Sequence, residues 1–400
     1  MKIITDRQKI KNLLTRAVST VAVKEHLEKK LMSGKKLRVK FGIDPTAPDI
    51  HLGHTVPLLK LRQFQDLGHQ AILIIGDFTA RIGDPTGRLE ARKPLSESEV
   101  KRNMKDYLKQ AAKVIDTKKT KIYCNSEWFN KMTAREFLEL TNKVTLQQVT
   151  KREDFKDRIK KDIDITGSEV IYPLLQGYDS VMTRADVEVG GEDQLLNLLM
   201  GRRIQRAYDM PEQDILTTWL IEGTDGVRKM SKSYGNYIGI TEEPDVMFGK
   251  LMSIPDALMI KYFGALTLIP HADTAEIEAK IKNGKLNPRD AKNRLSFEIV
   301  KIYHGEKKAE KAKKEFESVF QKHELPKNIP SAVIKKGQYN IVDLLVTIGL
   351  ASSKNQARRL IIGDAVKING KVLNDSKSAV NTAPGMIVQA GKKRFKKLKI

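Results

Sequence analysis

Residues 37–54 read LRVKFGIDPTAPDIHLGH, and this segment carries the clearest structural signal in the chain. From Leu37 to Ile43, apolar residues occupy every second place, which is the periodicity of a β-strand. The next five residues, DPTAP, contain two prolines and a turn-forming aspartate, so regular structure must break there. The segment predicts a strand that ends in a tight loop.

The residues after this loop predict a helix and a second strand. Apolar side chains from about His54 to Leu67 recur at helical spacing, and Gly68 closes the segment as a helix C-cap would. The run AILIIG, residues 71–76, is continuously apolar, as strands buried in parallel sheets are. This strand–helix–strand pattern is a βαβ unit, so we expect an α/β fold with a doubly wound, Rossmann-like parallel sheet.

The composition favours a folded protein of several domains with a polyanionic partner. The chain has 400 residues, of which 40% are hydrophobic and 30% are charged. Its 72 Lys and Arg residues outnumber 49 Asp and Glu residues, which gives a net charge of +23. Such an excess favours nucleic acid, because Lys and Arg contacts to phosphate dominate that affinity. A solvated, salt-tolerant surface is the alternative explanation.

The single cysteine, Cys124, excludes an intramolecular disulfide and a thiolate zinc site. The N-terminal residues MKIITDRQKIKNLL contain no apolar run long enough for a signal peptide, and no segment approaches the length of a membrane span. We therefore expect a cytoplasmic protein with no membrane partner and no bound structural metal.

Changes in residue pattern along the chain predict three domains and a linker. The segment GTDGVRKMSKSYGN has three glycines and no apolar period, so it should be an exposed, mobile loop. The linker is marked by Pro326, Pro330 and Gly337. The expected bounds are 1–240 for the α/β domain, with a helical insertion at about 125–162 and the exposed loop at 226–236, then 241–325 for an α-helical domain, 326–338 for the linker and 339–400 for a small α+β module.

The C-terminal module is strongly basic. Two helices are expected, one ending at Gly349 and one capped by Ser352 or Ser353, and the Asn369-Gly370 pair suits the type I′ turn of a hairpin. Residues 341–400 contain 12 Lys and Arg against 3 Asp, a net charge of +9. The candidate RNA contacts are Lys354, Arg358 and Arg359 in the second helix and Lys392, Lys393 and Arg394 near the end.

The loop after the first strand leads into His51-Leu52-Gly53-His54. A helix that begins there offers free N–H groups and the positive end of its dipole, which suit a phosphate. The two imidazoles can donate hydrogen bonds to phosphate oxygens, and Gly53 permits close backbone approach. A metal pair and two histidines satisfied within the core are the alternatives, and no third metal ligand is obvious nearby.

The exposed loop contains Arg228-Lys229-Met230-Ser231-Lys232-Ser233. Lysines three residues apart on a mobile loop can close over a triphosphate and neutralise the charge that develops on a leaving pyrophosphate. A solvated basic loop is the alternative, since most Lys and Arg clusters are solvated.

HLGH at a helix start and KMSKS late in an α/β domain together resemble the class I aminoacyl-tRNA synthetases, in order and in separation. Three further motifs are similar to those of the bacterial tyrosyl-tRNA synthetases: GDPTG at 83–87, YPLLQGYD at 172–179 and GGEDQ at 190–194. The resemblance covers essentially the whole chain, including a C-terminal module similar to the S4 RNA-binding domain.

The resemblance implies roles for fifteen residues of the α/β domain. The catalytic residues, which would contact the ATP phosphates and the departing pyrophosphate, are Thr46, His51, His54, Lys229 and Lys232. The other residues of the ATP site are Gly53, Gly191, Asp193, Met230 and Ser231, with Asp193 at the ribose. The residues that would hold tyrosine are Asp84, Tyr172, Gln176, Asp179 and Gln194, with Asp179 accepting a hydrogen bond from the phenol.

Structural roles compete with the tyrosine-binding assignments. The alternatives are a core aromatic for Tyr172, a helix-surface amide for Gln176, a turn residue before proline for Asp84, and an ion pair with Arg184 for Asp179. The chain also departs from the family just before the GxDP turn. Many members have a tyrosine there that contacts the substrate hydroxyl, whereas this chain has a lysine, at position 40.

The implied reaction is attack by the carboxylate of L-tyrosine on the α-phosphate of Mg²⁺-bound ATP, followed by transfer of the tyrosyl group to the terminal ribose of tRNA(Tyr). A carboxylate is already nucleophilic, so catalysis rests on positioning and charge stabilisation. The resemblance also implies a homodimer formed through the 125–162 insertion. Two rivals are a tryptophanyl-tRNA synthetase of the same fold and a non-catalytic RNA-binding protein that retains the synthetase shape.

Overall fold

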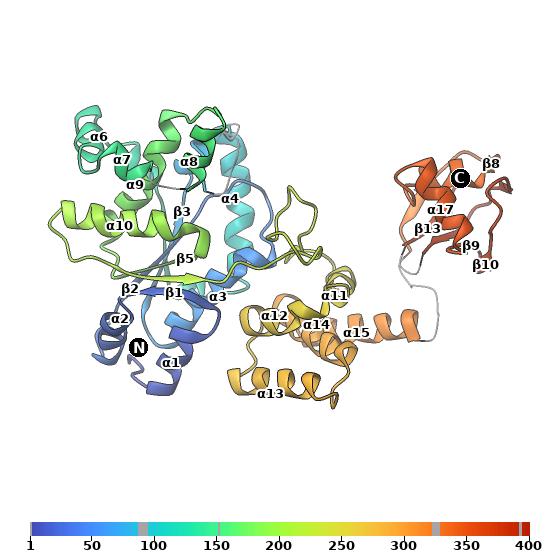
Figure 1. The fold of residues 1–400 in the computed structure, drawn as a ribbon, viewed down its shortest axis with the longest axis horizontal. Helices are drawn as coiled ribbons and strands as arrows, with labels where there is room; N and C mark the ends of the chain where they lie inside the picture. The colour runs from blue at the N-terminus through green and yellow to red at the C-terminus, as the bar shows by residue number, and fades with distance from the viewer. Residues whose placement is uncertain (1, 87–94, 151–152, 322–328, 392–393) are drawn as a thin grey trace. The chain divides into compact units, whose positions relative to one another are not determined.

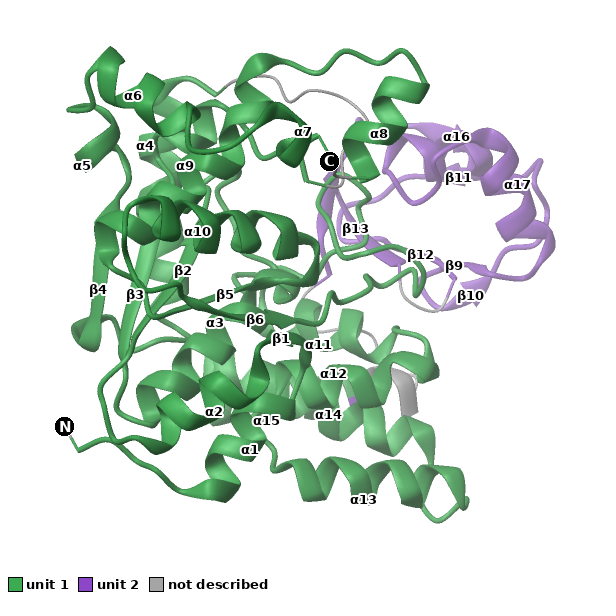
Figure 2. Ribbon diagram, turned by 60° about the vertical axis from the view of Figure 1, so that its left-hand side comes forward, with its two compact units in different colours: residues 1–316 green, residues 317–400 purple. Residues whose placement is uncertain are grey.

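The computed structural model describes residues 2–86, 95–150, 153–321, 329–391 and 394–400. The chain divides into two compact units, residues 1–316 and residues 317–400, which are coloured separately in Figure 2. The first unit is built around a six-stranded sheet with helices on both faces (Figure 1). No helix in the described part of the chain is long and apolar enough to cross a membrane.

The sheet of the first unit has the order β1-β6-β5-β2-β3-β4. β1 is antiparallel to β6, and the other neighbouring strands pair in parallel. The strands are β1 (Val18–Ala22), β2 (Arg38–Ile43), β3 (Gln70–Ile75), β4 (Thr120–Cys124), β5 (Val187–Gly191) and β6 (Asp214–Thr218). The expected doubly wound sheet is confirmed, and its strand order reverses between β2 and β5.

Helices cover both faces of this sheet (Figure 1). α3 (Leu52–Asp66) packs on β2, β3, β5 and β6, whereas α9 (Gly167–Thr183) packs on β2 and α10 (Leu195–Ala207) packs on β5 and β6. Alternate residues of β3 belong to different cores: Leu73 lies in the core with α3, and Ile74 lies in the core with α9 and α10. A strand buried on both faces must be apolar throughout, which explains the AILIIG run.

The remaining helices run to residue 321. They are α1 (Arg7–Thr15), α2 (Lys24–Met32), α4 (Glu97–Ala111), α5 (Ser126–Phe129), α6 (Ala134–Thr141), α7 (Leu146–Val149), α8 (Glu153–Lys160), α11 (Pro244–Met252), α12 (Met259–Leu266), α13 (His271–Lys282), α14 (Pro288–His304) and α15 (Glu306–Gln321). α5 to α8 occupy the expected helical insertion, and α11 to α15 occupy the expected helical domain.

The helical segment after residue 240 shares a core with the sheet. One continuous cluster includes Leu73 of β3, Phe248 of α11 and Leu295 of α14. Arg16 also joins the two parts, because its guanidinium donates to four carbonyl oxygens at and after the C-terminal end of α12. The expected division at residue 240 therefore falls inside one compact unit.

The second unit contains a five-stranded sheet of order β10-β9-β12-β13-β7 and a two-stranded sheet, β11-β8. Its elements are β7 (Ser331–Val333), β8 (Gln338–Asn340), α16 (Ile341–Thr347), α17 (Lys354–Ile362), β9 (Val366–Ile368), β10 (Lys371–Val372), β11 (Ala379–Asn381), β12 (Ile387–Ala390) and β13 (Arg394–Lys399). Ser353 caps α17, and Asn369 and Gly370 both have positive φ, as a type I′ hairpin turn requires.

The C-terminal module begins earlier than its sequence pattern suggests. β7 lies inside the stretch 326–338 that we assigned to a linker, yet it pairs in parallel with β13. Three residues are too few to show a strand periodicity, so the pairing could not be seen in the sequence. The module therefore includes residues from Ser331 onward, and not only those from Tyr339.

Lys60 is a buried cation in α3, on the helix that starts at the HLGH motif. Its side chain is 2% exposed, and its ammonium donates to the carbonyl oxygens of Leu13 and Arg16, each at 2.7 Å, and to Gln63 Oε1 at 2.8 Å. Burial, together with the charge of Arg16, lowers the Lys60 pKa to about 7. The folded chain therefore releases this proton at a lower pH than the unfolded chain does.

We expect the free energy of unfolding to rise with pH above about 7, because the unfolded chain then holds a proton that the folded chain lacks. The contribution of Lys60 is at most about 1.4 kcal/mol per pH unit and is absent in Lys60→Met. Urea unfolding of both proteins at pH 7, 8 and 9 measures it. Equal slopes for the two proteins would mean that Lys60 keeps its proton in the fold.

Candidate active site

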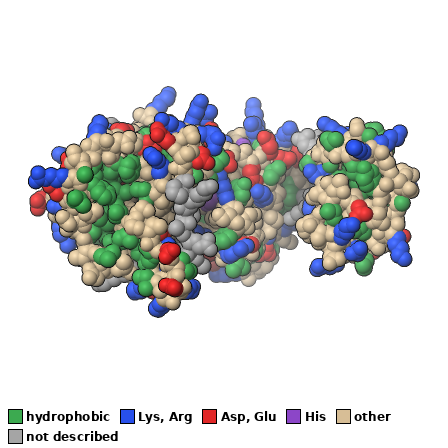
Figure 3. All heavy atoms as spheres, turned by 90° about the horizontal axis from the view of Figure 1, so that it is seen from above, with side chains coloured by type: hydrophobic (Ala, Val, Ile, Leu, Met, Phe, Trp, Pro, Cys, Tyr) green, Lys and Arg blue, Asp and Glu red, His purple; other side chains and the backbone are tan. Residues whose placement is uncertain are grey.

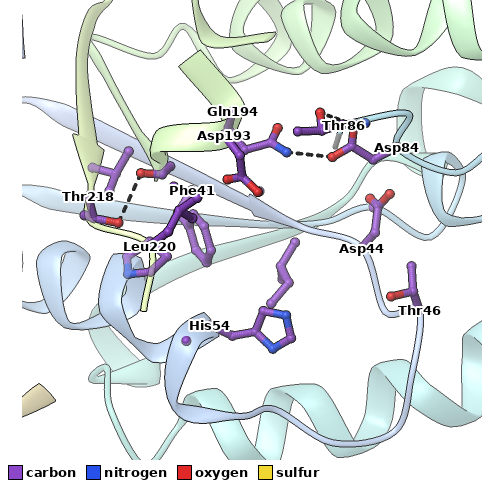
Figure 4. A pocket seen from close by; sticks show the side chains of 18 of the residues that line it. Phe41, Asp44, Thr46, His54, Asp84, Thr86, Asp193, Gln194, Thr218 and Leu220 are labelled. Atoms are coloured by element: carbon purple, nitrogen blue, oxygen red, sulfur yellow. Dashed lines mark hydrogen bonds between the residues drawn. The ribbon is translucent and has the colours of Figure 1, made fainter. Parts of the chain in front are cut away.

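A cavity of about 890 Å³ opens where β2, β3 and β5 end, which is the edge at which open α/β sheets bind ligands. Every residue that the resemblance assigned to the α/β domain lines it, except Lys232. Figure 4 shows Asp84, Asp193 and Gln194 along one side and His54 along the opposite side, with Asp44 and Thr46 between them. The fold thus collects segments that are far apart in the sequence.

Asp84 and Gln194 meet in the wall of the cavity. Gln194 Nε2 donates to Asp84 Oδ2 at 2.6 Å, and Thr86 donates to Asp84 Oδ1 through its amide at 3.0 Å and its hydroxyl at 2.6 Å. Asp84 therefore builds the turn before Pro85 and also presents a carboxylate to the cavity. The turn-forming and the ligand-binding interpretations of Asp84 are compatible.

Tyr172 is a buried member of the cavity wall. Its hydroxyl donates to Asp44 Oδ2 at 2.9 Å, and Thr79 Oγ1 donates to Asp44 Oδ1 at 2.8 Å. Burial, followed by the charges of Asp44 and Asp84, raises the Tyr172 pKa well above its usual value, so the hydroxyl stays a donor. Asp44 has no role in the sequence motifs, although it follows directly after β2, where a side chain points to the ligand edge of the sheet.

Asp179 lies at the buried end of the cavity. Trp128 Nε1 donates to its Oδ1 at 3.0 Å, and Asn125 Nδ2 donates to its Oδ2 at 3.4 Å. Burial raises the Asp179 pKa to about 7, against the lowering effects of Lys40 and the two hydrogen bonds. Both oxygens have partners other than Arg184, which is exposed, so the alternative of an Arg184 ion pair is wrong.

His51 and His54 stack on each other in the first turn of α3. His51 is the N-cap residue, so the helix begins at Leu52, slightly earlier than expected, and the ring centroids are 3.7 Å apart. Burial and the nearby Lys232 and Lys229 lower the pKa of His51 to about 2 and that of His54 to about 4. Both imidazoles are therefore neutral at physiological pH.

The hydrogen bonds of the two rings show which atoms they can offer a ligand. His54 Nδ1 accepts from the His51 amide at 3.5 Å, so the proton of this neutral ring belongs on Nε2, which can donate. His51 Nδ1 is buried and has no hydrogen-bond partner among the described residues. A Cβ at Gly53 would lie 3.1 Å from the His51 ring, which is closer than most Cβ contacts. Glycine at this position therefore avoids crowding the ring.

The loop at 226–236 contributes the cations. Lys229 Nζ lies 3.0 Å from Asp193 Oδ2, and Lys232 Nζ lies 3.4 Å from Asp49 Oδ2. Met230 between them is buried and lines the cavity, as Ser231 also does. Both lysines are thus paired with carboxylates, Lys229 with one in the cavity lining and Lys232 with one outside it, and these ion pairs are partly exposed.

Asn236 fixes the loop and was missed in the sequence. Its side chain is 3% exposed, its Oδ1 accepts from the Ser231 amide at 2.8 Å, and its Nδ2 lies 3.0–3.2 Å from Asp225 Oδ2 and the carbonyl oxygens of Arg228 and Lys229. One side chain thereby holds both ends of the lysine motif. Its position at the end of the loop gave no periodic signal.

The candidate RNA contacts lie in the second unit. Figure 3 shows Lys and Arg side chains over the visible face of this unit, with few acidic ones among them. Arg358 and Arg359 are exposed on α17, Lys354 pairs with Asp343 at 2.8 Å, and Arg394 donates to the Leu350 carbonyl at 2.8 Å. Lys392 and Lys393 lie outside the described residues. In the described parts of both units, no group of three His, Cys, Asp or Glu side chains could hold a metal ion.

Comparisons with known proteins place this chain in a family. Residues 32–321 match the family model of class I tRNA synthetases (W and Y), and residues 321–398 match the C-terminal domain of tyrosine–tRNA ligases. The tyrosine–tRNA ligase of Moorella thermoacetica is 48% identical over 96% of this chain and 94% of its own length. That of Thermotoga maritima is 48% identical over 98% of this chain and 97% of its own length.

Solved structures share the fold of this chain at lower identity. A C-terminally truncated mitochondrial tyrosyl-tRNA synthetase of Aspergillus nidulans has a TM-score of 0.66 at 23% identity, covering 79% of this chain and 95% of that one. The tyrosyl-tRNA synthetase of Archaeoglobus fulgidus, complexed with L-tyrosine, has a TM-score of 0.62 at 24% identity, covering 76% of this chain and 99% of that one. With family models spanning residues 32–398 and relatives nearly half identical over almost the whole length, this chain belongs to the tyrosine–tRNA ligases of the class I tRNA synthetases.

Proposed function

We propose that this protein activates L-tyrosine with ATP and transfers the tyrosyl group to the 3′-terminal ribose of tRNA(Tyr). The observation that carries the proposal is a cavity that joins a buried acceptor, Asp179, to the start of α3 and to Lys229. Lys232 lies close enough to affect both histidines of that helix start. One end suits a phenol, the other suits a triphosphate, and the reacting atoms would meet between them.

The amino-acid end of the cavity suits a zwitterionic amino acid whose side chain ends in a hydroxyl. Asp84 and Gln176, with the Tyr172 hydroxyl beside them, surround the place for the α-ammonium, and Asp179 accepts from the phenolic hydroxyl. Phenylalanine would leave the buried Asp179 without that donor, which disfavours its binding. Gln194 holds Asp84 in orientation through its 2.6 Å hydrogen bond.

The phosphate end supplies neutral donors and movable cations. In the first step a carboxylate oxygen of tyrosine bonds to the α-phosphorus while the bond to the β-phosphate oxygen breaks, and pyrophosphate leaves. Thr46 and the neutral His54 donate to the phosphates, and Lys229 and Lys232 exchange their carboxylate partners for pyrophosphate. Mg²⁺ enters as part of the ATP substrate, and Asp193 then binds the ribose.

For the second step we assign no catalytic residue beyond those of the first step. A ribose hydroxyl of tRNA attacks the tyrosyl carbonyl carbon, AMP leaves, and the hydroxyl proton is lost. The basic second unit and the helical segment after residue 240 are the surfaces that we assign to tRNA. The reaction takes place in the cytoplasm, where tRNA and ATP are available to a translation enzyme.

A tryptophan–tRNA ligase is the rival with the same fold, since the tryptophanyl-tRNA synthetase of Plasmodium falciparum has a TM-score of 0.59 at 16% identity. Pyrophosphate exchange into ATP, measured with each of the twenty amino acids, decides between them. Tyrosine should be the one amino acid that supports rapid exchange. Exchange with tryptophan instead would overturn the assignment, and exchange with none would favour a pure RNA-binding protein.

We further propose that the protein is a homodimer assembled through α6 to α8 and the adjoining faces of α9 and α10. Large apolar side chains are exposed there: Leu138 is 61% exposed, Leu146 62% and Ile159 60%. Met182, Leu196 and Leu199 on α9 and α10 are 41–48% exposed. An apolar surface of this kind needs a partner, and a second copy offers the same surface in a twofold arrangement.

Changing Leu138 and Leu146 together to Glu should convert the dimer to a monomer, because buried carboxylates without partners oppose association. Sedimentation velocity measures the change. Leu268→Glu is the matched control, since Leu268 is 66% exposed and lies in the helical segment after residue 240. This substitution should leave the sedimenting species a dimer. A dimer that survives the double change would place the interface elsewhere.

Lys232→Ala should slow tyrosyl-adenylate formation by about a hundredfold, because one electrostatic contact to a developing charge contributes about 3 kcal/mol. Tyrosine affinity should stay nearly unchanged, since Lys232 does not line the amino-acid end of the cavity. Stopped-flow activation kinetics measure both quantities. Lys285→Ala, an exposed lysine between α13 and α14, is the control. Activation at the wild-type rate would remove Lys232 from the mechanism.

Deleting residues 331–400 should leave pyrophosphate exchange intact and severely weaken tRNA charging. The truncation starts at β7 because that strand belongs to the C-terminal sheet. Full-length Arg358→Ala/Arg359→Ala should show part of the same loss, largest at low salt, because phosphate contacts weaken as salt rises. Charging assays over a salt series test this. Equal charging by all three proteins would exclude a role for this unit in RNA binding.

A further inference from the structure

Lys40 and Glu188 form a buried ion pair behind the amino-acid end of the cavity. They are register neighbours on the parallel strands β2 and β5, each is 1% exposed, and Lys40 Nζ lies 2.9 Å from Glu188 Oε1. An ion pair in so dry a place requires further hydrogen bonds to be tolerated.

The ion pair satisfies all the donors of Lys40. Besides Glu188, its ammonium donates to Ser180 Oγ at 2.6 Å and to the Gln176 carbonyl oxygen at 3.0 Å. An ammonium has three N–H groups, and these three acceptors use them all. Lys40 therefore has no donor left for a substrate and acts from behind the pocket.

Glu188 in turn holds the residues around it. Gln176 Nε2 donates to Glu188 Oε1 at 3.2 Å, Ser180 Oγ lies 3.3 Å from Oε2, and Gln213 Nε2 donates to the same oxygen. Because its side-chain nitrogen Nε2 binds Glu188, Gln176 has its side-chain oxygen Oε1 available to the cavity. An oxygen acceptor is what an ammonium group needs. The pair thus orients a side chain of the pocket wall.

The same contacts enclose the turn of α9 that carries Asp179. Gln176 and Ser180, both bound by Lys40, stand three residues before and one residue after Asp179 on the helix. The positive charge of Lys40 consequently faces the segment that presents the acceptor for the phenol.

We propose that the Lys40–Glu188 ion pair is a positioning device that determines selectivity for tyrosine: it fixes Gln176 and Asp179 on one turn of α9 and places a cation behind the segment that carries Asp179, without touching the substrate. This inference rests on the proposed function. It explains why a buried ion pair is placed directly behind the helix turn that carries Asp179.

The charge balance around Asp179 makes the inference testable by pH. Burial has the largest effect on Asp179 and raises its pKa to about 7. Lys40 on β2 opposes this rise, and Glu188 on β5 adds to it. Tyr172 on α9, Asp44 after β2 and Asp84 in the turn are also ionisable groups of the cavity lining. The remaining ionisable groups of the lining are His51, His54, Tyr107, Asp193, Lys229 and Tyr234. Protonation of Asp179 makes it a much weaker acceptor, because its negative charge is lost and one oxygen becomes a donor, so tyrosine binding should weaken as pH falls through the Asp179 pKa.

The pH below which tyrosine binding weakens is called the pH limit here. Two variants that neutralise charges of the ion pair should move this pH limit in opposite directions. Glu188→Gln keeps the cation and should shift the acid limb of the pH profile for tyrosine KM to lower pH. Lys40→Met/Glu188→Gln removes the pair and should shift it to higher pH, because Lys40 has the larger effect on Asp179. A shift of one pH unit corresponds to about a tenfold change in tyrosine KM at pH values below the limit.

Pyrophosphate exchange with tyrosine and with phenylalanine, over pH 5.5–9, gives KM and kcat for each protein. Arg158→Met/Glu169→Gln is the matched control, because it removes another buried ion pair that also contacts α9, at its N-terminus. We expect the Lys40→Met/Glu188→Gln protein to lose about tenfold in tyrosine-over-phenylalanine preference, and the control to keep both the preference and the pH limit.

Thermal unfolding of each variant establishes that it is folded, and Glu188→Gln remains a test if the double variant does not fold. A folded double variant or Glu188→Gln protein with the wild-type pH limit and preference would make the pair purely structural. Failure of the proposed function would look different, since the wild-type protein itself would then show no exchange with tyrosine.

Discussion

Parallel pairing of β2 with β3 on one side and β5 on the other makes all three strands end at one edge, and the cavity occupies that edge. The loop after β2 brings Asp44 and Thr46, the start of α3 brings the two histidines, and the loop after β5 brings Asp193 and Gln194. A register shift of one residue between β2 and β5 would turn Lys40 to the opposite face and leave Glu188 buried without a cation. The sheet register is thus a condition for the pocket as well as for the fold.

The motif residues could be located from the sequence because they follow strand ends or helix starts, which are readable from periodicity and from proline and glycine. The residues that support them could not. Asn125 and Trp128 reach Asp179 across more than fifty positions, and Asn236 holds the lysine motif from the end of a loop. Side chains that act on other side chains leave no repeat in the sequence. The start of the C-terminal module was missed for a related reason, since β7 is defined by its pairing with β13 alone.

The two ends of the cavity are built by different physical means. At the amino-acid end, buried groups are fixed by hydrogen bonds from several elements, and the charge of Asp179 depends on its neighbours. Such a network selects by what it leaves unpaired, and in the proposed function an amino acid without a hydroxyl is penalised for that reason. At the phosphate end, the lysines are on an exposed loop and form partly exposed ion pairs, which are weak and easily exchanged.

The stacked histidines explain why the cations have to be on the loop. Two stacked imidazoles 3.7 Å apart, one buried and one partly buried, are held neutral, so the fixed wall of the proposed phosphate end offers hydrogen bonds and a helix N-terminus but no full positive charge. Full charge is supplied by Lys229 and Lys232, which Asn236 anchors at the base of their loop. A permanently cationic wall would hold pyrophosphate after the reaction. In the proposed reaction, a neutral wall with cations on a loop would bind charge during the transfer and release the product when the loop moves away.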